Sequence, residues 1–323
     1  MEDGFKREID YLRISITDRC NFRCRYCMPE KGVEPKKHED ILTFEEILQF
    51  VNAAASLGIT KVRVTGGEPL VRKGVVGFIE KLSSINGIKD VSMTTNGCLL
   101  PDMARHLKEA GLNRVNISLD SLKSQRFREI TRCGELSKVL QGIRAALEVG
   151  LTPVKINCVV VKGFNDDEIM DFVKLTQEYP LFVRFIELMP LGERGWGKNR
   201  FISAQDIKAS INQKLIPTGI PAGAGPAIYY KVPKSLGSIG FITPISQHFC
   251  PMCNRLRLTA DGKLKPCLES DIEIDIKSAF NENKSEEKLK SLFKQALEQK
   301  PLRHHMTSEQ NADHFRKMWQ IGG

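Results

Sequence analysis

The sequence lacks any long apolar stretch without charge, and its cysteines, although many for an intracellular chain, are sparse for a disulfide scaffold. No uncharged run approaches the length of a membrane span. Its first residues, "MEDGFKREIDYL", mix acids and bases where a signal peptide would carry an apolar segment. Nine cysteines in 323 residues are too sparse for a disulfide-stabilised scaffold. We therefore expect no membrane segment, no signal peptide and a location in the reducing cytoplasm.

The chain also lacks the features of a nucleic-acid-binding protein. Its formal net charge is +9, but Lys and Arg are spread along the sequence, without a basic block or interleaved aromatic residues. We expect this positive charge to serve a pocket for a small polyanion, with no nucleic acid as a partner.

Short strand-like runs alternate with helical segments along the first two thirds of the chain. The runs cover residues 11–17, 61–65, 90–96, 114–120, 153–161 and 181–189. One helix begins at Thr43 with Glu46 three positions on, a capping-box pattern, and two others (103–112 and 136–151) reach a glycine stop. Because there is no Rossmann glycine fingerprint, the alternation predicts an α/β fold with a partial, incomplete TIM-type barrel of about six βα units.

The pattern changes after about residue 205. A stretch rich in Gly and Pro leads into a second group of cysteines, and a charged helical segment follows. We therefore expect two units. Residues 1–204 would form the partial barrel, and residues 205–323 would form a C-terminal α+β extension that closes the barrel mouth.

Within the predicted strands, apolar and polar residues alternate. A strand buried on both faces should be apolar throughout, so the two faces of these strands differ. If helices cover the outside, the polar set lines the lumen: Arg13, Ser15, Thr17, Arg63, Thr65, Ser92, Thr94, Asn96, Asn116, Ser118, Asp120, Lys155 and Asn157. Buried Arg and Lys are costly without a partner, which a bound anion would supply. The alternative is an ordinary sheet with one solvent-exposed face.

Three cysteines follow the first strand, at the barrel end where active sites collect. Cys20, Cys24 and Cys27 have the spacing C-x3-C-x2-C. Three thiolates on a four-iron cubane leave one iron open, whereas a closed structural zinc site requires four ligands. The segment "CNFRCRYC" resembles the radical S-adenosylmethionine (SAM) enzymes, in which the open iron binds SAM. A second motif of these enzymes is "TGGEP", residues 65–69.

The resemblance implies a [4Fe–4S] cluster on these cysteines and a set of SAM contacts around it. Gly67 and Glu68 would meet the methionine end of SAM, and the backbone of Tyr26 would meet the adenine. Ser118 and Met189 match positions that contact the nucleoside. Without the resemblance, Met189 would be interpreted as a core residue.

A second cysteine group, Cys250, Cys253 and Cys267, has the spacing C-x2-C-x13-C. It again offers three thiolates and suits a second [4Fe–4S] cluster, with an open iron for substrate. A zinc site is the alternative and would need a fourth ligand, for which His248 is the nearest candidate. The remaining cysteines are interpreted as ordinary thiols: Cys98, Cys133 and Cys158.

Nearly the whole chain resembles one family of radical SAM enzymes, the GTP 3′,8-cyclases of molybdenum cofactor biosynthesis. The resemblance rests on "LRISITDRCNFRCRYCMP", "VRVTGGEPLVR", "TTNG", "NISLDSL", residues 225–268 and the terminal "IGG". It implies two clusters, with SAM on the first and GTP on the second. It also implies an electron donor such as flavodoxin or ferredoxin, transfer of product to cyclic pyranopterin monophosphate synthase, and a homodimer.

The implied reaction is a lyase-type cyclisation driven by a 5′-deoxyadenosyl radical. The radical removes hydrogen from ribose C3′ of GTP, the carbon radical attacks C8 of the guanine, and reduction with protonation gives (8S)-3′,8-cyclo-7,8-dihydroguanosine 5′-triphosphate. The GTP-binding positions of the family match Arg13, Arg63, Thr94, Lys155, Arg255, Leu256 and Arg257. The alternation independently places Arg13, Arg63 and Lys155 in the lumen, and the planar forks of Arg255 and Arg257 suit a purine edge or a phosphate.

Two further segments admit more than one interpretation. Gly322-Gly323 would be a ragged end in most proteins, but in the family this pair reaches into the active site and supports catalysis. "GERGWGKN", residues 192–199, nearly fits the P-loop pattern. Asn199 lacks the hydroxyl that ligates magnesium, so we expect no P-loop activity. Residues 302–320 are less typical of the family.

Two other functions are alternatives. A radical SAM maturase acting on a peptide would need an open groove instead of a tight cationic lumen. An iron–sulfur sensor or nucleic-acid-binding module would have no use for the "TGGEP" turn and would not cleave SAM.

Overall fold

The computed structural model describes residues 1–190, 199–221, 225–282, 285–307 and 316–322. Within them, one twelve-stranded sheet runs in the order β12-β11-β10-β1-β2-β3-β4-β5-β6-β9-β8-β7. Six consecutive strands are parallel neighbours: β1 (Tyr11–Ser15), β2 (Lys61–Thr65), β3 (Asp90–Thr95), β4 (Arg114–Ser118), β5 (Lys155–Val160) and β6 (Phe182–Glu187). The others are β7 (Ile216–Pro217), β8 (Ile228–Lys231), β9 (Ser238–Ile242), β10 (Arg255–Leu258), β11 (Lys263–Lys265) and β12 (Ile274–Asp275). The order is linear and leaves the sheet open, so the prediction of a partial barrel is confirmed.

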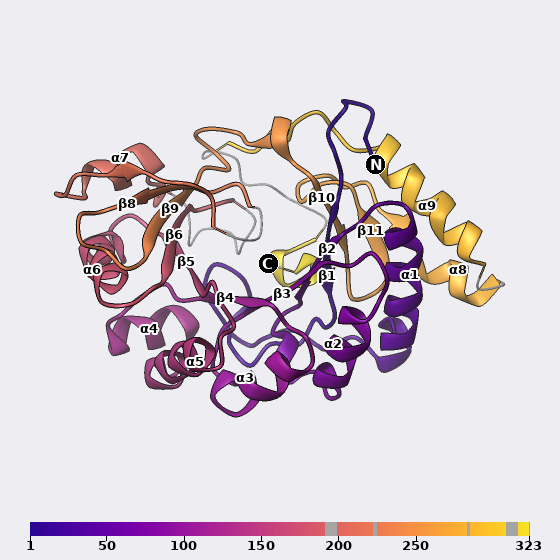
Figure 1. Ribbon diagram of the computed structural model, residues 1–323, viewed down its shortest axis with the longest axis horizontal. Coiled ribbons are helices and arrows are strands. Elements are labelled where there is room, and N and C mark those ends of the chain that lie inside the picture. The colour runs from indigo at the N-terminus through magenta and orange to yellow at the C-terminus, as the bar shows by residue number, and fades with distance from the viewer. Residues whose placement is uncertain (191–198, 222–224, 283–284, 308–315, 323) are drawn as a thin grey trace.

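Helices α1 to α6 connect the parallel strands and form an outer layer around their arc (Figure 1). The helices are α1 (Phe44–Ser56), α2 (Val75–Ser83), α3 (Leu100–Glu109), α4 (Ser124–Thr131), α5 (Leu136–Glu148), α6 (Ile169–Glu178), α7 (Ala204–Ala209), α8 (Lys277–Glu282), α9 (Glu286–Glu298) and α10 (Met318–Ile321). Short 3-10 turns are η1 (His38–Asp40), η2 (Pro69–Val71), η3 (Asp166–Glu168) and η4 (Cys250–Met252). None of the helices in the described ranges is long and apolar enough to span a membrane.

The capping box predicted at the start of α1 is present. Thr43 Oγ1 accepts a hydrogen bond from Glu46 N over 3.1 Å, and Thr43 N donates to the Glu46 carboxylate over 2.7 Å. Such a cap stabilises a helix start by about 1 kcal/mol.

The apolar side chains of the strands pack outward against the helices. Leu12, Val62 and Ile156 are fully buried in one continuous hydrophobic core. Burial of each such side chain contributes about 1.5–3 kcal/mol. The polar residues of the same strands face the concave side, where the parallel register aligns Arg13 with Arg63. The predicted alternation is therefore confirmed.

The C-terminal part of the chain extends this sheet at both edges. β9 pairs in parallel with β6, and β10 pairs in parallel with β1. Helix α9 packs against α1, where the rings of Phe50 and Phe293 lie 6.2 Å apart. The last described residues return to the inside of the arc of strands, where the C-terminus is marked in Figure 1. The second cysteine group is thereby brought next to β1, because β10 begins two residues after Cys253.

Candidate functional site

A cavity with about 1430 Å³ of atom-free space, part of it open solvent at the mouth, lies on the concave face of the sheet. Its wall combines strand residues, Tyr26 from the first cysteine loop, the second cysteine group, and Met318 of α10.

Six cationic side chains line the cavity. They are Arg13, Arg63, Arg184, Arg255, Arg257 and Lys300. Asp120 is the one carboxylate residue among the described residues that line it. Burial lowers the pKa of Arg13, and the charge of Arg257 lowers it further. Because buried like charges are costly without compensation, the wall suits a small polyanion.

Most of the predicted GTP-binding side chains meet at this wall. Those that line the cavity are Arg13, Arg63, Thr94, Arg255 and Arg257. Lys155 is buried close by, and its pKa falls to about 6 because burial, together with the charges of Arg184 and Arg114, disfavours the ammonium form. Leu256 differs from the rest, since its side chain lies in the hydrophobic core on the opposite face of β10.

Arg184 is a cavity residue without a counterpart among the sequence predictions. It lies on β6 opposite Asn157 of β5 and is buried. Its Nε has no hydrogen-bond partner among the atoms of the described residues. The alternation within residues 181–189 could have indicated it, because Arg184 has the same parity as the polar residues of the neighbouring strands.

The first cysteine loop follows β1 and is fixed to two neighbouring segments. Arg23 N donates to Thr131 O over 3.0 Å at the end of α4, and Glu68 N donates to Arg19 O over 2.8 Å. A Cβ atom at Gly67 would lie 2.4 Å from Arg19 O, so the close contact between the two segments requires glycine. The "TGGEP" turn therefore packs directly against the cysteine loop.

Cys20, Cys24 and Cys27 are partly exposed on this loop, and Cys27 N donates to Cys24 O over 2.9 Å. Burial raises the pKa of Cys20 to about 11. Burial, reinforced by Cys20, raises the pKa of Cys27 to about 12. Bound metal would convert such thiols to thiolates, because coordination to a cation deprotonates them. The donor set therefore fits an iron–sulfur cluster.

The predicted SAM contacts divide between the cavity wall and the turn behind it. Those on the wall are Tyr26, Ser118 and Met189. Glu68 lies in the turn, where its buried carboxylate accepts hydrogen bonds from Leu70 N (3.0 Å), Thr95 Oγ1 (2.7 Å) and Asn96 N (2.7 Å). Burial raises the pKa of Glu68 to about 7 against the effect of these bonds. Glu68 thus ties "TGGEP" to the "TTNG" turn after β3.

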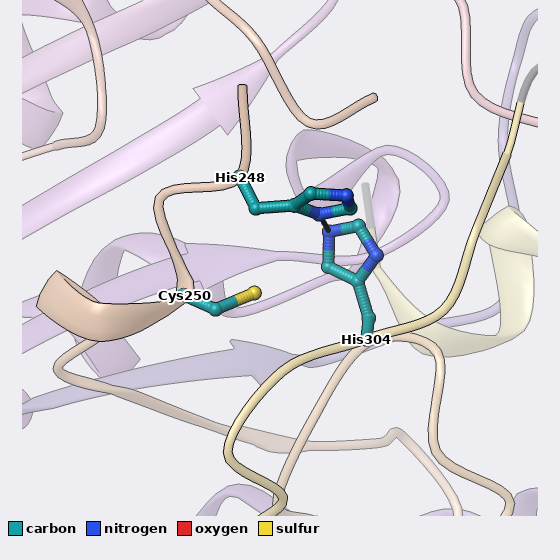
Figure 2. Close-up of side chains that lie close together, drawn as sticks. All are labelled: His248, Cys250 and His304. Atoms are coloured by element: carbon teal, nitrogen blue, oxygen red, sulfur yellow. Dashed lines mark hydrogen bonds between the residues drawn. The ribbon is translucent and has the colours of Figure 1, made fainter. Parts of the chain in front are cut away.

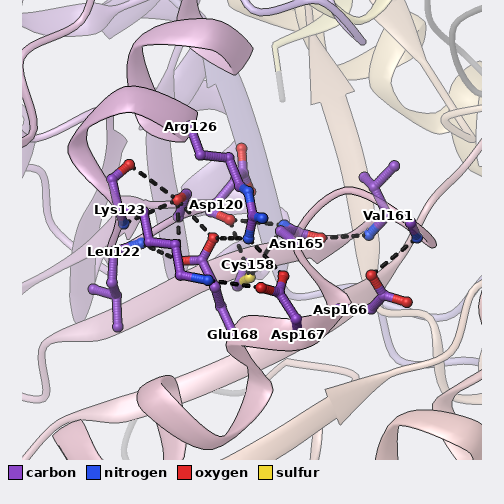
Figure 3. Close-up of polar contacts among 12 residues, drawn as sticks. Asp120, Leu122, Lys123, Arg126, Cys158, Val161, Asn165, Asp166, Asp167 and Glu168 are labelled. Carbon is purple, nitrogen blue, oxygen red and sulfur yellow. Dashed lines mark hydrogen bonds and ion pairs between the residues drawn. The ribbon is translucent and has the colours of Figure 1, made fainter.

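Tyr26 and Asp120 connect the first cysteine loop to the end of β4. Tyr26 Oη donates to Asp120 Oδ2 over 2.7 Å, and Val159 N donates to Asp120 Oδ1 over 2.8 Å. Asn165 Nδ2 donates to the main-chain oxygen of Asp120 over 2.7 Å (Figure 3). Burial raises the pKa of Asp120 to about 6. Each oxygen of the Asp120 carboxylate therefore has its own donor, one from the first cysteine loop and one from β5.

A buried polar network supports this strand end from outside the cavity (Figure 3). Glu168 accepts hydrogen bonds from Ser121 Oγ (2.9 Å), Leu122 N (2.7 Å) and Arg126 Nη1 (2.6 Å). These contacts join the start of α6 to the segment that follows β4, and Cys158 is buried beside them.

Cys250, Cys253 and Cys267 all line the cavity. Burial by itself raises the pKa of Cys253, but Arg255 and Lys300 outweigh it and lower the pKa to about 6. The Nζ of Lys300 lies 3.6 Å from the Cys253 sulfur. A thiolate is therefore favoured at this position before any metal binds.

Neither cysteine group forms a compact three-sulfur site for one ion. In the described parts of the chain, the group that brings three ligand atoms within 4.8 Å of one another is His248, Cys250 and His304. Different irons of a cubane bind the different thiolates, so wider separation of the three sulfurs fits a cluster better than a single zinc ion.

The C-terminal residues reach the cavity beside both cysteine groups. The backbone of Trp319 lies near the sulfur of Cys27 and, against the larger raising effect of burial, lowers the pKa of that thiol, and Arg257 Nη1 donates to Gly322 O over 3.1 Å. A Cβ at Gly322 would lie 2.9 Å from Thr65 Cγ2. Gly322 is thus the predicted tail residue that the structure places at the site, whereas Gly323 lies outside the described residues.

Two other predicted segments are described only in part. Residues 191–198 of the P-loop-like stretch and residues 308–315 of the segment 302–320 lie outside the described ranges. Just after the second of these, Arg316 is buried and forms ion pairs with Asp261 (2.9 Å) and Glu273. These contacts dock the final residues against the C-terminal strands.

Comparisons with known proteins cover the chain in two consecutive matches. The family model of the Radical SAM superfamily matches residues 14–176, and that of Molybdenum Cofactor Synthesis C matches residues 181–306. The GTP 3',8-cyclase of Alkaliphilus metalliredigens is 52% identical over 324 residues, and that of Moorella thermoacetica is 54% identical over 325 residues. Both alignments cover 100% of each chain.

Solved structures support the fold. Streptococcus suis SuiB bound to S-adenosylmethionine superposes with a TM-score of 0.59 at 15% sequence identity, over 85% of this chain and 64% of that one. At this identity the likeness supports the fold alone.

Proposed function

The chain belongs to the GTP 3′,8-cyclase family of the radical SAM superfamily, and on this basis we propose that it converts GTP to (8S)-3′,8-cyclo-7,8-dihydroguanosine 5′-triphosphate. The reaction is the first step of molybdenum cofactor biosynthesis. Membership of the superfamily implies an iron–sulfur cluster and SAM as cofactors.

One observation carries the assignment to this site: a single cavity is lined by the second cysteine group, by the Tyr26 side chain of the first cysteine loop, and by a set of cations. A peptide-modifying enzyme would have no use for so many buried cations. A triphosphate compensates them, because each charge-assisted contact to a phosphate oxygen offsets repulsion within the set.

Cys20, Cys24 and Cys27 are proposed to hold the [4Fe–4S] cluster that binds SAM. When bound and reduced, this cluster supplies the electron that cleaves SAM to a 5′-deoxyadenosyl radical. Around it, we assign Gly67 and Glu68 to the methionine end. Tyr26, Ser118 and Met189 are assigned to the nucleoside, in agreement with their place on the cavity wall.

Cys250, Cys253 and Cys267 are proposed to hold a second [4Fe–4S] cluster that binds the substrate. The favoured thiolate at Cys253 and the neighbouring cations support this assignment, because cations offset the negative charge of a thiolate-ligated cluster. We assign residues 1–204 to the SAM side of the enzyme and residues 205–323 to the substrate side.

The chain's own cations are proposed to position GTP. Arg13, Arg63, Thr94, Lys155 and Arg184 would hold the triphosphate, and Arg255 and Arg257 would meet the nucleotide near the second cysteine group. Leu256 would contribute its backbone, since its side chain is in the core. Fixing both ends of GTP holds ribose C3′ within reach of the radical, and such positioning is worth several kcal/mol. Closure by Gly322 and its neighbours would exclude water.

The partners proposed from the family are a flavodoxin or ferredoxin as electron donor, and cyclic pyranopterin monophosphate synthase as the enzyme that receives the product. A homodimer and a cytoplasmic location are part of the same proposal.

The test is turnover by anaerobically reconstituted protein with dithionite, SAM and GTP. We expect 5′-deoxyadenosine and the cyclised nucleotide to form in equal amounts, with no cyclised product from ATP. SAM cleavage without any cyclised nucleotide would contradict the proposed substrate and favour a peptide-modifying enzyme.

A further inference from the structure

His248, Cys250 and His304 converge at the edge of the cavity (Figure 2). His248 Nδ1 lies 3.1 Å from His304 Nε2, with the two rings inclined by 61°. Each residue contributes one ligand atom, and the three atoms lie within 4.8 Å of one another. Cys250 and His304 are buried while His248 is exposed, so the group joins the cavity wall to solvent.

The N-terminal segment holds the two arms of this group together. Arg7 Nη1 donates to Cys250 O over 3.0 Å and to Leu302 O over 3.0 Å, and its Nη2 donates to Pro301 O over 2.8 Å. An ion pair with Asp3 at 2.7 Å fixes the guanidinium. The positions of Cys250 and His304 are therefore set by the fold and do not depend on a bound ligand.

Two imidazole nitrogens and a thiolate are a donor set typical of zinc. At ordinary Zn–N distances, two nitrogens of a tetrahedral site lie roughly 3.3 Å apart, close to the 3.1 Å observed between His248 and His304. Met306 N donates to His304 Nδ1 over 3.3 Å, so in the metal-free chain Nε2 carries the proton and donates to His248. Metal binding at Nε2 would move that proton to Nδ1 in place of the Met306 contact, and the proton released to solvent would come from the Cys250 thiol.

We propose that His248, Cys250 and His304 form a mononuclear site for a divalent transition metal of the zinc type, with one position open to water. The site shares Cys250 with the proposed second cluster. That part of the proposal rests on the proposed function, and it makes the two occupants mutually exclusive. The metal would bind chains that have not received, or have lost, the second cluster.

Co²⁺ is the probe, because thiolate-to-cobalt charge transfer and tetrahedral d–d absorption report its ligands. The full chain is prepared anaerobically without iron and carries Cys24→Ala, which disables the first cysteine group. We expect one equivalent of Co²⁺ to bind, with a thiolate charge-transfer band, release of a proton, and displacement by Zn²⁺.

Variants then assign the ligands. Cys250→Ser should abolish the charge-transfer band, and His304→Ala should weaken Co²⁺ binding at least tenfold. His106→Ala, at an exposed histidine on α3, is the matched control and should leave binding unchanged. Equal loss in Cys253→Ser and Cys250→Ser would place the metal on the three cysteines and overturn the proposal, as would unaltered binding in His304→Ala.

Competition is tested separately on chains loaded with iron and sulfide. We expect no Co²⁺ uptake by the wild-type chain when both clusters are present, and uptake of one equivalent after the second cluster is removed. Uptake by the fully loaded chain would overturn the exclusivity. None of these experiments measures GTP turnover. A failure of the proposed GTP cyclase function can therefore be distinguished from a failure of the proposed metal site.

Discussion

The guanidinium of Arg257 donates a hydrogen bond to the carbonyl oxygen of Gly322 over 3.1 Å. Arg257 belongs to the cationic wall of the cavity and Gly322 to the last described residues, so this contact fixes the tail beside the cavity that the second cysteine group and Tyr26 of the first cysteine loop line. The backbone of Gly322 has a φ of +85°, and Ser15 and Thr65 surround its Cα.

Substitution of Gly322 should therefore impair catalysis and not folding. In Gly322→Ala the Cβ would lie 2.9 Å from Thr65 Cγ2, and the positive φ costs a further ~1 kcal/mol or more. We expect at least a tenfold loss of cyclised product, with an unfolding midpoint lowered by no more than about 2–4 °C. Gly77→Ala on the exposed side of α2 is the control, because its Cβ would meet no atom within 4 Å. Normal turnover in Gly322→Ala would show that the tail contact has no catalytic role.

Arg184 should be as important for triphosphate binding as Arg63. Both are buried in the cavity wall, and removal of either leaves fewer cations to meet the phosphates. In Arg184→Gln we expect the Kd for GTP to rise at least tenfold, with little change for guanosine, measured by equilibrium binding. Arg128→Gln on the exposed face of α4 should bind GTP normally. Equal losses for GTP and guanosine would argue against a phosphate contact at Arg184.

GTP binding should take up a proton at Lys155. Burial and the charges of Arg184 and Arg114 lower its pKa to about 6 in the free enzyme. Below pH 6 the ammonium form is already present. Above pH 6 Lys155 must acquire its proton when GTP binds. The affinity for GTP should therefore fall as the pH rises, by at most about tenfold per pH unit.

Calorimetry in buffers of different ionisation enthalpy measures this uptake. We expect a net gain of protons at pH 7.5 in the wild type and a smaller gain in Lys155→Met, which retains the titration of GTP itself. The same proton uptake in both proteins would refute the role of Lys155.

Loss of the Tyr26–Asp120 hydrogen bond should loosen the first cysteine loop. Tyr26→Phe leaves one oxygen of the buried Asp120 carboxylate without its 2.7 Å donor, a change that costs about 1–3 kcal/mol. We expect faster loss of iron from the first cluster under chelator, with SAM cleavage reduced in proportion. Tyr179→Phe, at a half-exposed tyrosine after α6, should retain iron like the wild type, whereas equal iron loss in both variants would rule out the proposed contact.

Local patterns predicted the first six strands, because each carries its own alternation and is bounded by glycine or capping signals. Arg13, Arg63 and Lys155 followed from the same alternation. The edge strands could not be predicted this way, since β10 is only four residues long and pairs with β1, which lies more than 200 residues away in the sequence. That pairing depends on packing of the whole sheet.

The contact between His248 and His304 also could not be predicted from sequence patterns. The two residues belong to separate segments with no periodicity, and Arg7 from a third segment bridges them. The burial of the Leu256 side chain was predictable in part. Neighbouring residues on a strand point to opposite faces, so Leu256 lies on the face opposite Arg255 and Arg257, and that face is part of the core.

We propose that the two cysteine groups hold two clusters beside one cavity. Iron analysis with Mössbauer spectroscopy on anaerobically reconstituted wild type and Cys253→Ala tests it most directly. We expect about eight irons per wild-type chain in two cubanes, about four in the variant, and a GTP-induced change at one iron site in the wild type alone. A single cubane in the wild type, or a GTP-induced change that persists in Cys253→Ala, would contradict it.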